Sequence, residues 1–151
     1  MKPNSTVKEQ SLNPHTAGRT ETETSAGELD DRILAALQAS TDKKAVDPVI
    51  LDLREIASFT DYFLIVSGTN ERQVQAIADE VYDSLKKTGS AAARVEGHKT
   101  AEWILLDYGD FVVHVFEQKA RRFYDLERLW RESKRVELPA QFTQGSLRTE
   151  S

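Results

Sequence analysis

The sequence predicts an α/β fold in which a mixed β-sheet is flanked by helices. Two stretches carry most of this prediction. Residues 101–116 read AEWILLDYGDFVVHVF, and two apolar runs separated by Gly109-Asp110 are typical of a β-hairpin. Residues 62–67 read YFLIVS and are nearly all apolar, which is typical of a central strand buried on both faces. Segments with helical periodicity before and after these strands supply the flanking layers.

The bulk composition limits the classes of function. The chain has 151 residues, of which 39% are hydrophobic, and this fits one domain with tails. A net charge of -5 argues against broad phosphate binding and permits binding to a basic protein surface. The absence of Cys excludes disulfides, thiolate metal sites and a Cys nucleophile. No apolar run approaches the roughly 20 residues of a membrane span and no secretory signal is found, so we expect a cytoplasmic protein without a membrane partner.

The chain divides into a predicted domain and two predicted tails. Residues 1–27 are rich in Ser, Thr, Pro, Gly and Glu and have almost no large apolar residue, so we expect a disordered N-terminal tail. Residues 28–133 form the predicted domain. Residues 134–151 have few apolar features and are predicted to be a flexible C-terminal tail.

The first half of the domain is predicted to run helix, strand, strand. Residues 28–40 are predicted to be helical because apolar residues recur at four-residue spacing. Ser25 and Glu28 have the spacing of a capping box at its entry. Residues 48–53 and 62–67 are the two predicted strands.

A second helix, three strands and a last helix are predicted to follow. The second helix spans residues 70–88, and Gly89 is its expected stop. Its apolar stripe consists of Val74, Ile77, Ala78, Val81 and Leu85. A short strand near residues 93–96 precedes the hairpin. The last helix is predicted at residues 118–132, with Phe123, Leu126 and Trp130 on one face.

The hairpin strands, at residues 103–108 and 111–116, each present two sets of side chains. One set is wholly apolar and is predicted to face the core: Ile104, Leu106, Tyr108, Phe111, Val113 and Val115. The other set is also largely apolar, but it carries an Asp and a His: Trp103, Leu105, Asp107, Val112, His114 and Phe116. This second face is either covered by helices or left for a partner.

Several motifs were weighed as sites and assigned structural roles. The sequence SGTN before the second helix lacks the second Gly and the Lys of a phosphate-binding loop, so Asn70 with Gln73 is interpreted as a helix cap. His98 and His114 do not have the spacing of metal ligands. We expect His114 to be a half-buried sheet residue with a hydrogen-bond partner. No metal and no cofactor is expected.

The acidic and basic residues are also interpreted as structural. The strand-end carboxylates Asp52, Asp61, Asp107 and Asp110 could hold Mg²⁺, but no strand carries an Asp-x-Asp pair, so turn and solvation roles are favoured. Arg121-Arg122 form a small basic spot, for which a solvated face is the default and direct RNA binding is weakly supported. No triad or G-x-S-x-G elbow is found, so no catalytic residue is assigned.

Two long segments resemble the ribosomal silencing factor family, also called Iojap-like. They are SFTDYFLIVSGTNERQVQAIADEV, residues 58–81, and EGHKTAEWILLDYGDFVVHVFEQKARRFYDLERLW, residues 96–130. The LDL of the first strand matches as well. The resemblance covers roughly residues 28–132.

The resemblance implies a fold and a function. It implies a mixed sheet similar to that of nucleotidyltransferases without their catalytic carboxylates. It further implies binding to the large ribosomal subunit through its fourteenth protein, a basic protein, which blocks joining of the small subunit and represses translation when nutrients are scarce. The free protein is expected to form a homodimer. Two other hypotheses remain: a nucleotidyltransferase-like enzyme, and a general adaptor that uses the same sheet face.

The family motif also implies site residues. It matches Glu96, Gly97, Trp103, Leu105, Asp107, Gly109 and Asp110. The Trp of the motif belongs to the family's ribosomal contact, so the second hairpin face is predicted to be at least partly a docking surface. The candidate partner-binding residues are Trp103, Leu105, Asp107, Glu102, Tyr108 and Asp110. His114 and Phe116 rank lower because the last helix offers cover for them.

Overall fold

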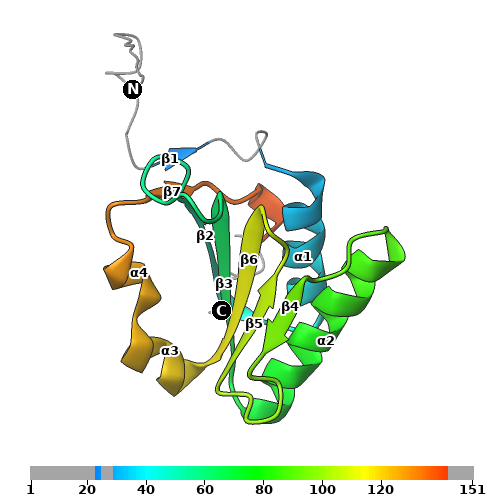
Figure 1. The fold of residues 1–151 in the computed structure, drawn as a ribbon. Coiled ribbons are helices and arrows are strands. Elements are labelled where there is room, and N and C mark those ends of the chain that lie inside the picture. Colours follow the sequence, from blue (N-terminus) through cyan, green and yellow to red (C-terminus); the bar gives the residue numbers. More distant parts are fainter. Residues whose placement is uncertain (1–22, 25–28, 143–151) are drawn as a thin grey trace, which may run out of the picture.

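The computed structural model describes residues 23–24 and 29–142. Within these residues, one seven-stranded sheet has the order β1-β7-β2-β3-β6-β5-β4 (Figure 1). The strands are β1 (Glu23–Thr24), β2 (Val46–Asp52), β3 (Tyr62–Gly68), β4 (Arg94–Glu96), β5 (Trp103–Asp107), β6 (Phe111–Glu117) and β7 (Lys134–Val136). Strands β3 and β6 are parallel at the centre, whereas β2, β5 and β4 join by antiparallel pairs. The predicted mixed sheet is therefore confirmed.

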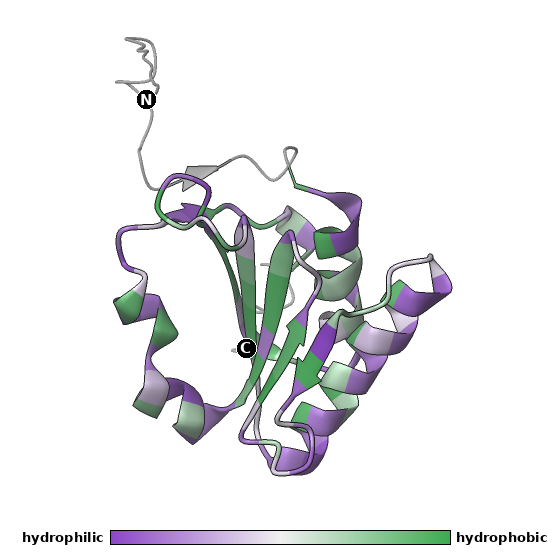
Figure 2. Cartoon of the chain, in the orientation of Figure 1, coloured by the Kyte–Doolittle hydropathy of each residue, from purple (hydrophilic) through white to green (hydrophobic). Residues whose placement is uncertain are grey.

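Helices lie on both faces of this sheet. Helices α1 (Asp31–Asp42) and α2 (Glu71–Lys87) pack on one face, and α3 (Gln118–Tyr124) and α4 (Leu126–Leu129) lie on the other (Figure 1). Figure 2 shows that β3 and β6 are hydrophobic along most of their length, while α2 carries both hydrophobic and hydrophilic positions. The sheet therefore separates a larger apolar cluster under α1 and α2 from a smaller one under α3 and α4.

The first two helices begin at side-chain caps. Helix α1 begins after Asp30, whose carboxylate accepts from the backbone N–H of Arg32 at 2.8 Å. The predicted capping box of Ser25 and Glu28 lies outside the described residues. Helix α2 begins after Asn70, whose side chain accepts from the N–H of Gln73 at 2.8 Å, so the predicted cap is confirmed.

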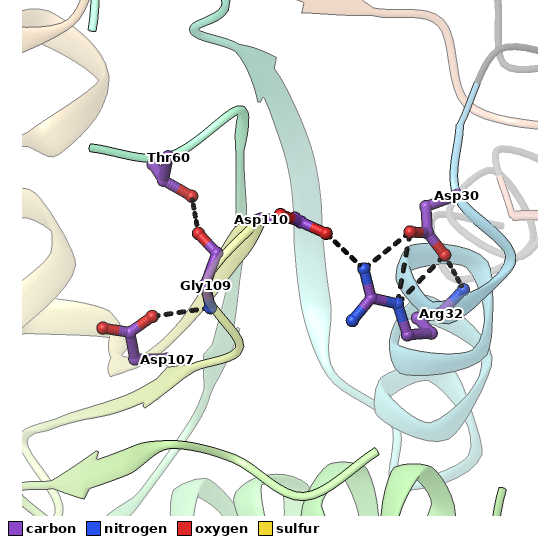
Figure 3. A network of polar contacts seen from close by, with 6 residues as sticks. All are labelled: Asp30, Arg32, Thr60, Asp107, Gly109 and Asp110. Carbon is purple, nitrogen blue, oxygen red and sulfur yellow. Dashed lines mark hydrogen bonds and ion pairs between the residues drawn. The ribbon is translucent and has the colours of Figure 1, made fainter. Parts of the chain in front are cut away.

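The hairpin has the predicted two-residue turn. Trp103 lies opposite Phe116 in the register and Asp107 opposite Val112, which leaves Gly109-Asp110 at the tip. Gly109 has a φ of 86°, a conformation that favours glycine. Its N–H donates to the Asp107 carboxylate at 2.9 Å (Figure 3). Turn chemistry therefore fixes the register and, with it, the two faces of the hairpin.

The sheet extends into both segments that we predicted to be tails. Lys134–Val136 forms strand β7, which pairs with β2. Val136 and Phe142 are buried in the cluster under α1 and α2. Glu23–Thr24 forms β1, which runs parallel to β7. The sheet thus continues past the predicted boundary at residue 133, and a three-residue strand is too short to show a period in the sequence.

The predicted last helix is two short helices. It breaks at Asp125, which has a left-handed φ of 50° between α3 and α4. Leu126 is buried and Trp130 is half-buried, but Phe123 is 80% exposed. The break turns α4 relative to α3, so the three residues do not share one face. Asp is tolerated in this conformation, and no Gly or Pro marked the break.

Candidate docking surface

The second hairpin face is divided between core and surface. On β6, Val112, His114 and Phe116 are buried. On β5, every second residue, Trp103, Leu105 and Asp107, is half-buried. Leu126 of α4 completes the small cluster, against which Ala120 and Trp130 pack. Helices α3 and α4 therefore cover the inner strands, and the β5 half of the face stays accessible.

Trp103 is held on three sides. Its ring stacks on Phe116 at a centroid distance of 4.9 Å and an interplanar angle of 28°. Its other neighbours are the ring of Tyr124, at 4.8 Å, and His114, to which the indole N–H donates at 3.0 Å. A half-buried Trp with a fixed ring offers a large contact area to a partner at a low cost in side-chain entropy.

His114 lies beneath Trp103 in the small cluster. We expected a half-buried residue with a hydrogen-bond partner, and the structure gives the partner but buries the side chain to 3% exposure. Burial lowers the pKa of His114 from 6.5 to about 3, so the ring is neutral at physiological pH. Its Nδ1 accepts from Trp103, and the neutral ring therefore carries its proton on Nε2.

Acidic residues lie on β5 and directly before it. Glu102, directly before the strand, is exposed. Asp107 is half-buried and lies 3.6 Å from Arg94, in addition to its bond with the turn. Both carboxylates lie on or beside the strand that carries Trp103, and both leave oxygen lone pairs for a basic partner.

Two of the candidate residues do not lie on this surface. Tyr108 is buried in the cluster under α1 and α2, where its ring stacks on Phe111 at 5.0 Å. The alternation of β5 points Tyr108 to the core face, which argues against its predicted role as a contact. Asp110 sits at the turn, where its carboxylate is 69% exposed and pairs with Arg32 at 2.8 Å (Figure 3). This ion pair joins α1 to the hairpin tip.

Arg32 links the start of α1 to the hairpin turn through its bonds to Asp30 and Asp110. Hydrogen bonds to Asp30, and then to Asp110, hold the pKa of the Arg32 guanidinium above its ordinary value. The same guanidinium lowers the pKa of Asp30. On the other side of the turn, the Thr60 hydroxyl donates to the Gly109 carbonyl at 3.0 Å (Figure 3). The tip of the hairpin is therefore held from both sides.

Tyr124 belongs to the surface and was missed by the sequence analysis. It is 45% exposed at the end of α3, and its ring contacts both Trp103 and Phe123. Its position in the sequence gave no signal, because its contact with Trp103 depends on how α3 packs against the sheet. We call Trp103, Leu105, Asp107 and Tyr124 the β5 surface.

The other motifs have structural roles. The Gln73 side chain accepts from the N–H of Thr69 at 2.7 Å, so the SGTN turn closes on itself as a cap. Arg121 is half-buried and pairs with Glu127 at 3.1 Å, whereas Arg122 is exposed. Across residues 23–24 and 29–142, no group of three or more His, Asp or Glu side chains is arranged to hold a metal. In the same part of the chain, no helix has the length and hydrophobicity needed to span a bilayer.

The fold and the β5 surface together define an α/β domain with an accessible face that carries aromatic and acidic side chains. The family described as "Ribosomal silencing factor during starvation" matches residues 26–151. The chain belongs to this family. The ribosomal silencing factor of Halalkalibacterium halodurans is 45% identical over 103 residues, which cover 68% of this chain and 88% of that protein. The factor of Bacillus subtilis is 45% identical over 95 residues, covering 63% of this chain and 80% of that one.

More distant and structural relatives agree with this assignment. A mouse protein named for mitochondrial assembly of the large ribosomal subunit is 31% identical over 91 residues, which cover 58% of this chain and 40% of that protein. A crystal structure from Chromobacterium violaceum is similar with a TM-score of 0.67 and 35% identity, covering 74% of this chain and 90% of that one. One from Bacillus halodurans has a TM-score of 0.65 and 42% identity, covering 72% and 98%. The names of the two bacterial relatives describe a silencing factor of the ribosome, and the mouse name describes assembly of the large subunit.

Proposed function

We propose that the chain docks on the large ribosomal subunit through its fourteenth protein and sterically blocks joining of the small subunit. The observation that carries this proposal is the accessible β5 half of an otherwise covered sheet face. The family membership supplies the ribosome as the target. The proposal assigns a binding function and no catalytic residue.

The chemistry of the β5 surface suits a basic protein partner. Trp103 and Tyr124 are adjacent aromatic rings, the kind of residue that dominates protein interfaces. Asp107 supplies negative charge on the same strand face as Trp103, Glu102 lies directly before that strand, and the whole chain carries a net charge of -5. Opposite charge on the partner would speed encounter and fix the orientation of docking.

Light scattering of mixed subunits tests the proposal. Purified large subunits are incubated with the protein before small subunits are added at an association-promoting Mg²⁺ concentration. The wild type is expected to lower the association signal, and Trp103→Glu and Tyr124→Ala to restore it. Trp103→Glu also removes the bond to His114, so its fold must be checked by circular dichroism. Tyr124→Ala removes only ring contacts at an exposed position.

Two variants with the same change of charge test whether the acidic residues near β5 contribute to binding. Glu102→Lys is expected to weaken binding to isolated fourteenth protein about tenfold, because like charges would meet at the rim. Asp83→Lys makes the same charge change at an exposed position of α2, across the sheet, and is expected to bind as the wild type does. Sedimentation of the free variants checks that all share one oligomeric state, since a homodimer is expected. Equal loss in both variants, or no effect of the wild type on joining, would refute the proposal.

A further inference from the structure

His114 is a buried polar residue in the cluster under α3 and α4, and only one of its two ring nitrogens has a hydrogen-bond partner. His114 lies among apolar residues of this cluster, with Val112 and Phe116 on the same face of β6 and Ile65 opposite it on β3. Its Nδ1 accepts from Trp103, but its Nε2 is buried without a hydrogen-bond partner. The ring of Phe63 meets it edge-on at a centroid distance of 4.3 Å, a contact weaker than a hydrogen bond.

Core packing alone does not account for a histidine at this position. An unpartnered buried N–H destabilises a fold, and an aliphatic residue of similar size would avoid that cost. What an aliphatic residue would lose is the acceptor for the Trp103 indole. The His114 side chain is therefore best explained by the one hydrogen bond that it makes.

We propose that His114 is a positioning residue that fixes the Trp103 indole in the orientation needed for docking. This inference rests on the proposed function, because it assumes that Trp103 contacts the partner. His114 itself is buried and makes no contact with a partner. It acts only through Trp103.

The geometry explains why a hydrogen bond is needed there. Stacking on Phe116 restrains the plane of the indole, but a flat contact allows the ring to slide or to flip over. The bond from the indole N–H to Nδ1 selects one of the two ring faces. An anchor held in its bound conformation loses less conformational freedom on docking, so affinity rises without any new contact.

Two variants of similar size separate the acceptor from the packing. His114→Asn places an amide oxygen near the position of Nδ1, because both side chains branch at Cγ. His114→Leu has nearly the same shape as Asn and no acceptor. Affinity for large subunits is expected to fall roughly threefold to tenfold in His114→Leu, the range for freeing one side chain, and to stay within about twofold of wild type in His114→Asn. Equal affinity of the two variants would overturn the proposal.

A double-mutant cycle with Trp103→Phe tests whether His114 acts through the indole. Phe keeps an aromatic ring but has no N–H to donate. In the Trp103→Phe background, His114→Leu is expected to change affinity by less than about twofold, because the bond is already absent. An undiminished effect in that background would place His114 in a general structural role and refute the proposal. Ile65→Val, which trims a neighbour of His114 and keeps the bond, is the packing control.

A measurement without ribosomes separates this inference from the proposed function. In a Trp130→Phe background Trp103 is the one remaining Trp, so its indole N–H gives a single ¹⁵N resonance. Hydrogen exchange at that N–H is expected to be at least tenfold faster in His114→Leu than in wild type or His114→Asn. Unchanged exchange would overturn the positioning role. Wild-type protein that fails to bind large subunits would instead refute the proposed function, whatever the exchange rates show.

Discussion

Two buried polar atoms of the hairpin lack hydrogen-bond partners, and they lie on opposite faces. The Tyr108 hydroxyl is buried on the α1 and α2 side, where burial raises its pKa to about 12, with a smaller contribution from Tyr82. His114 Nε2 is buried on the side of α3 and α4. Each costs free energy of folding. The structure shows a compensating contact for His114, its bond to Trp103, and none for the Tyr108 hydroxyl.

The pKa of His114 predicts that acid destabilises the fold. Its pKa is about 3 in the folded protein and about 6.5 in the unfolded chain, so between these values the unfolded chain binds the extra proton. The lowered pKa of His114 makes its full contribution to the free energy of unfolding above pH 6.5, and this contribution is lost as the pH falls toward 3. At 1.36 kcal/mol per pH unit, roughly 2 kcal/mol disappears between pH 7.5 and pH 5.

Urea unfolding at the two pH values measures this loss. His114→Leu is expected to lose about 2 kcal/mol less than wild type over the same interval, because it has no group to protonate. The remaining titratable groups are common to both proteins, so the difference isolates His114. An identical pH dependence of the two proteins would show that His114 is not held neutral by the fold.

At the scale of elements, patterns repeated over several residues were predictable and single-residue events were not. The period of two in the hairpin gave both faces correctly, because alternation is a local property of a strand. The stripe of α2 was buried as predicted. The left-handed Asp125, the short strand β7 and the contact of Tyr124 with Trp103 were not predictable. Each of these features depends on tertiary packing, and none is marked in the sequence by a repeating hydrophobic pattern or by a Gly or Pro.

A glycine before β5 gives the clearest prediction at this scale. Gly97 has a φ of 85°, and a Cβ built there would lie 2.0 Å from the backbone oxygen of Trp103. Gly97→Ala is therefore expected to destabilise the protein by more than about 2 kcal/mol and to displace Trp103, since backbone atoms have little room to move. Thermal unfolding reports the first effect, and the emission spectrum of Trp103 in a Trp130→Phe background reports the second.

Gly109→Ala is the matched control. Gly109 has nearly the same φ, 86°, but a Cβ there would meet nothing within 4 Å. It is expected to cost only the conformational strain of about 1–2 kcal/mol and to leave Trp103 in place. Equal destabilisation by the two substitutions would mean that the contact with Trp103 is relaxed without cost.

At the scale of the whole molecule, the sheet is completed from the two ends of the described chain. Strand β7 covers the edge of β2, and β1 covers β7 in turn. An uncovered β2 would present unpaired backbone groups. At the opposite edge, the short strand β4 is exposed and carries Arg94 and Glu96, charges that discourage pairing with another strand. The β5 surface thus lies near the charged edge, far from the edge that the chain ends complete.

Truncation tests how far the domain extends beyond the boundary predicted from sequence. A chain ending at residue 133 loses β7 and the buried side chains of Val136 and Phe142, which are 3% and 8% exposed. Removing one buried Phe side chain typically costs about 3–5 kcal/mol, a large part of the total stability of a small domain. A chain ending at Phe142 keeps both. Urea midpoints should therefore fall sharply for the first truncation and little for the second. If the chain ending at residue 133 unfolded at the wild-type urea concentration, β7 would contribute nothing to stability, and the shorter domain predicted from sequence would be correct.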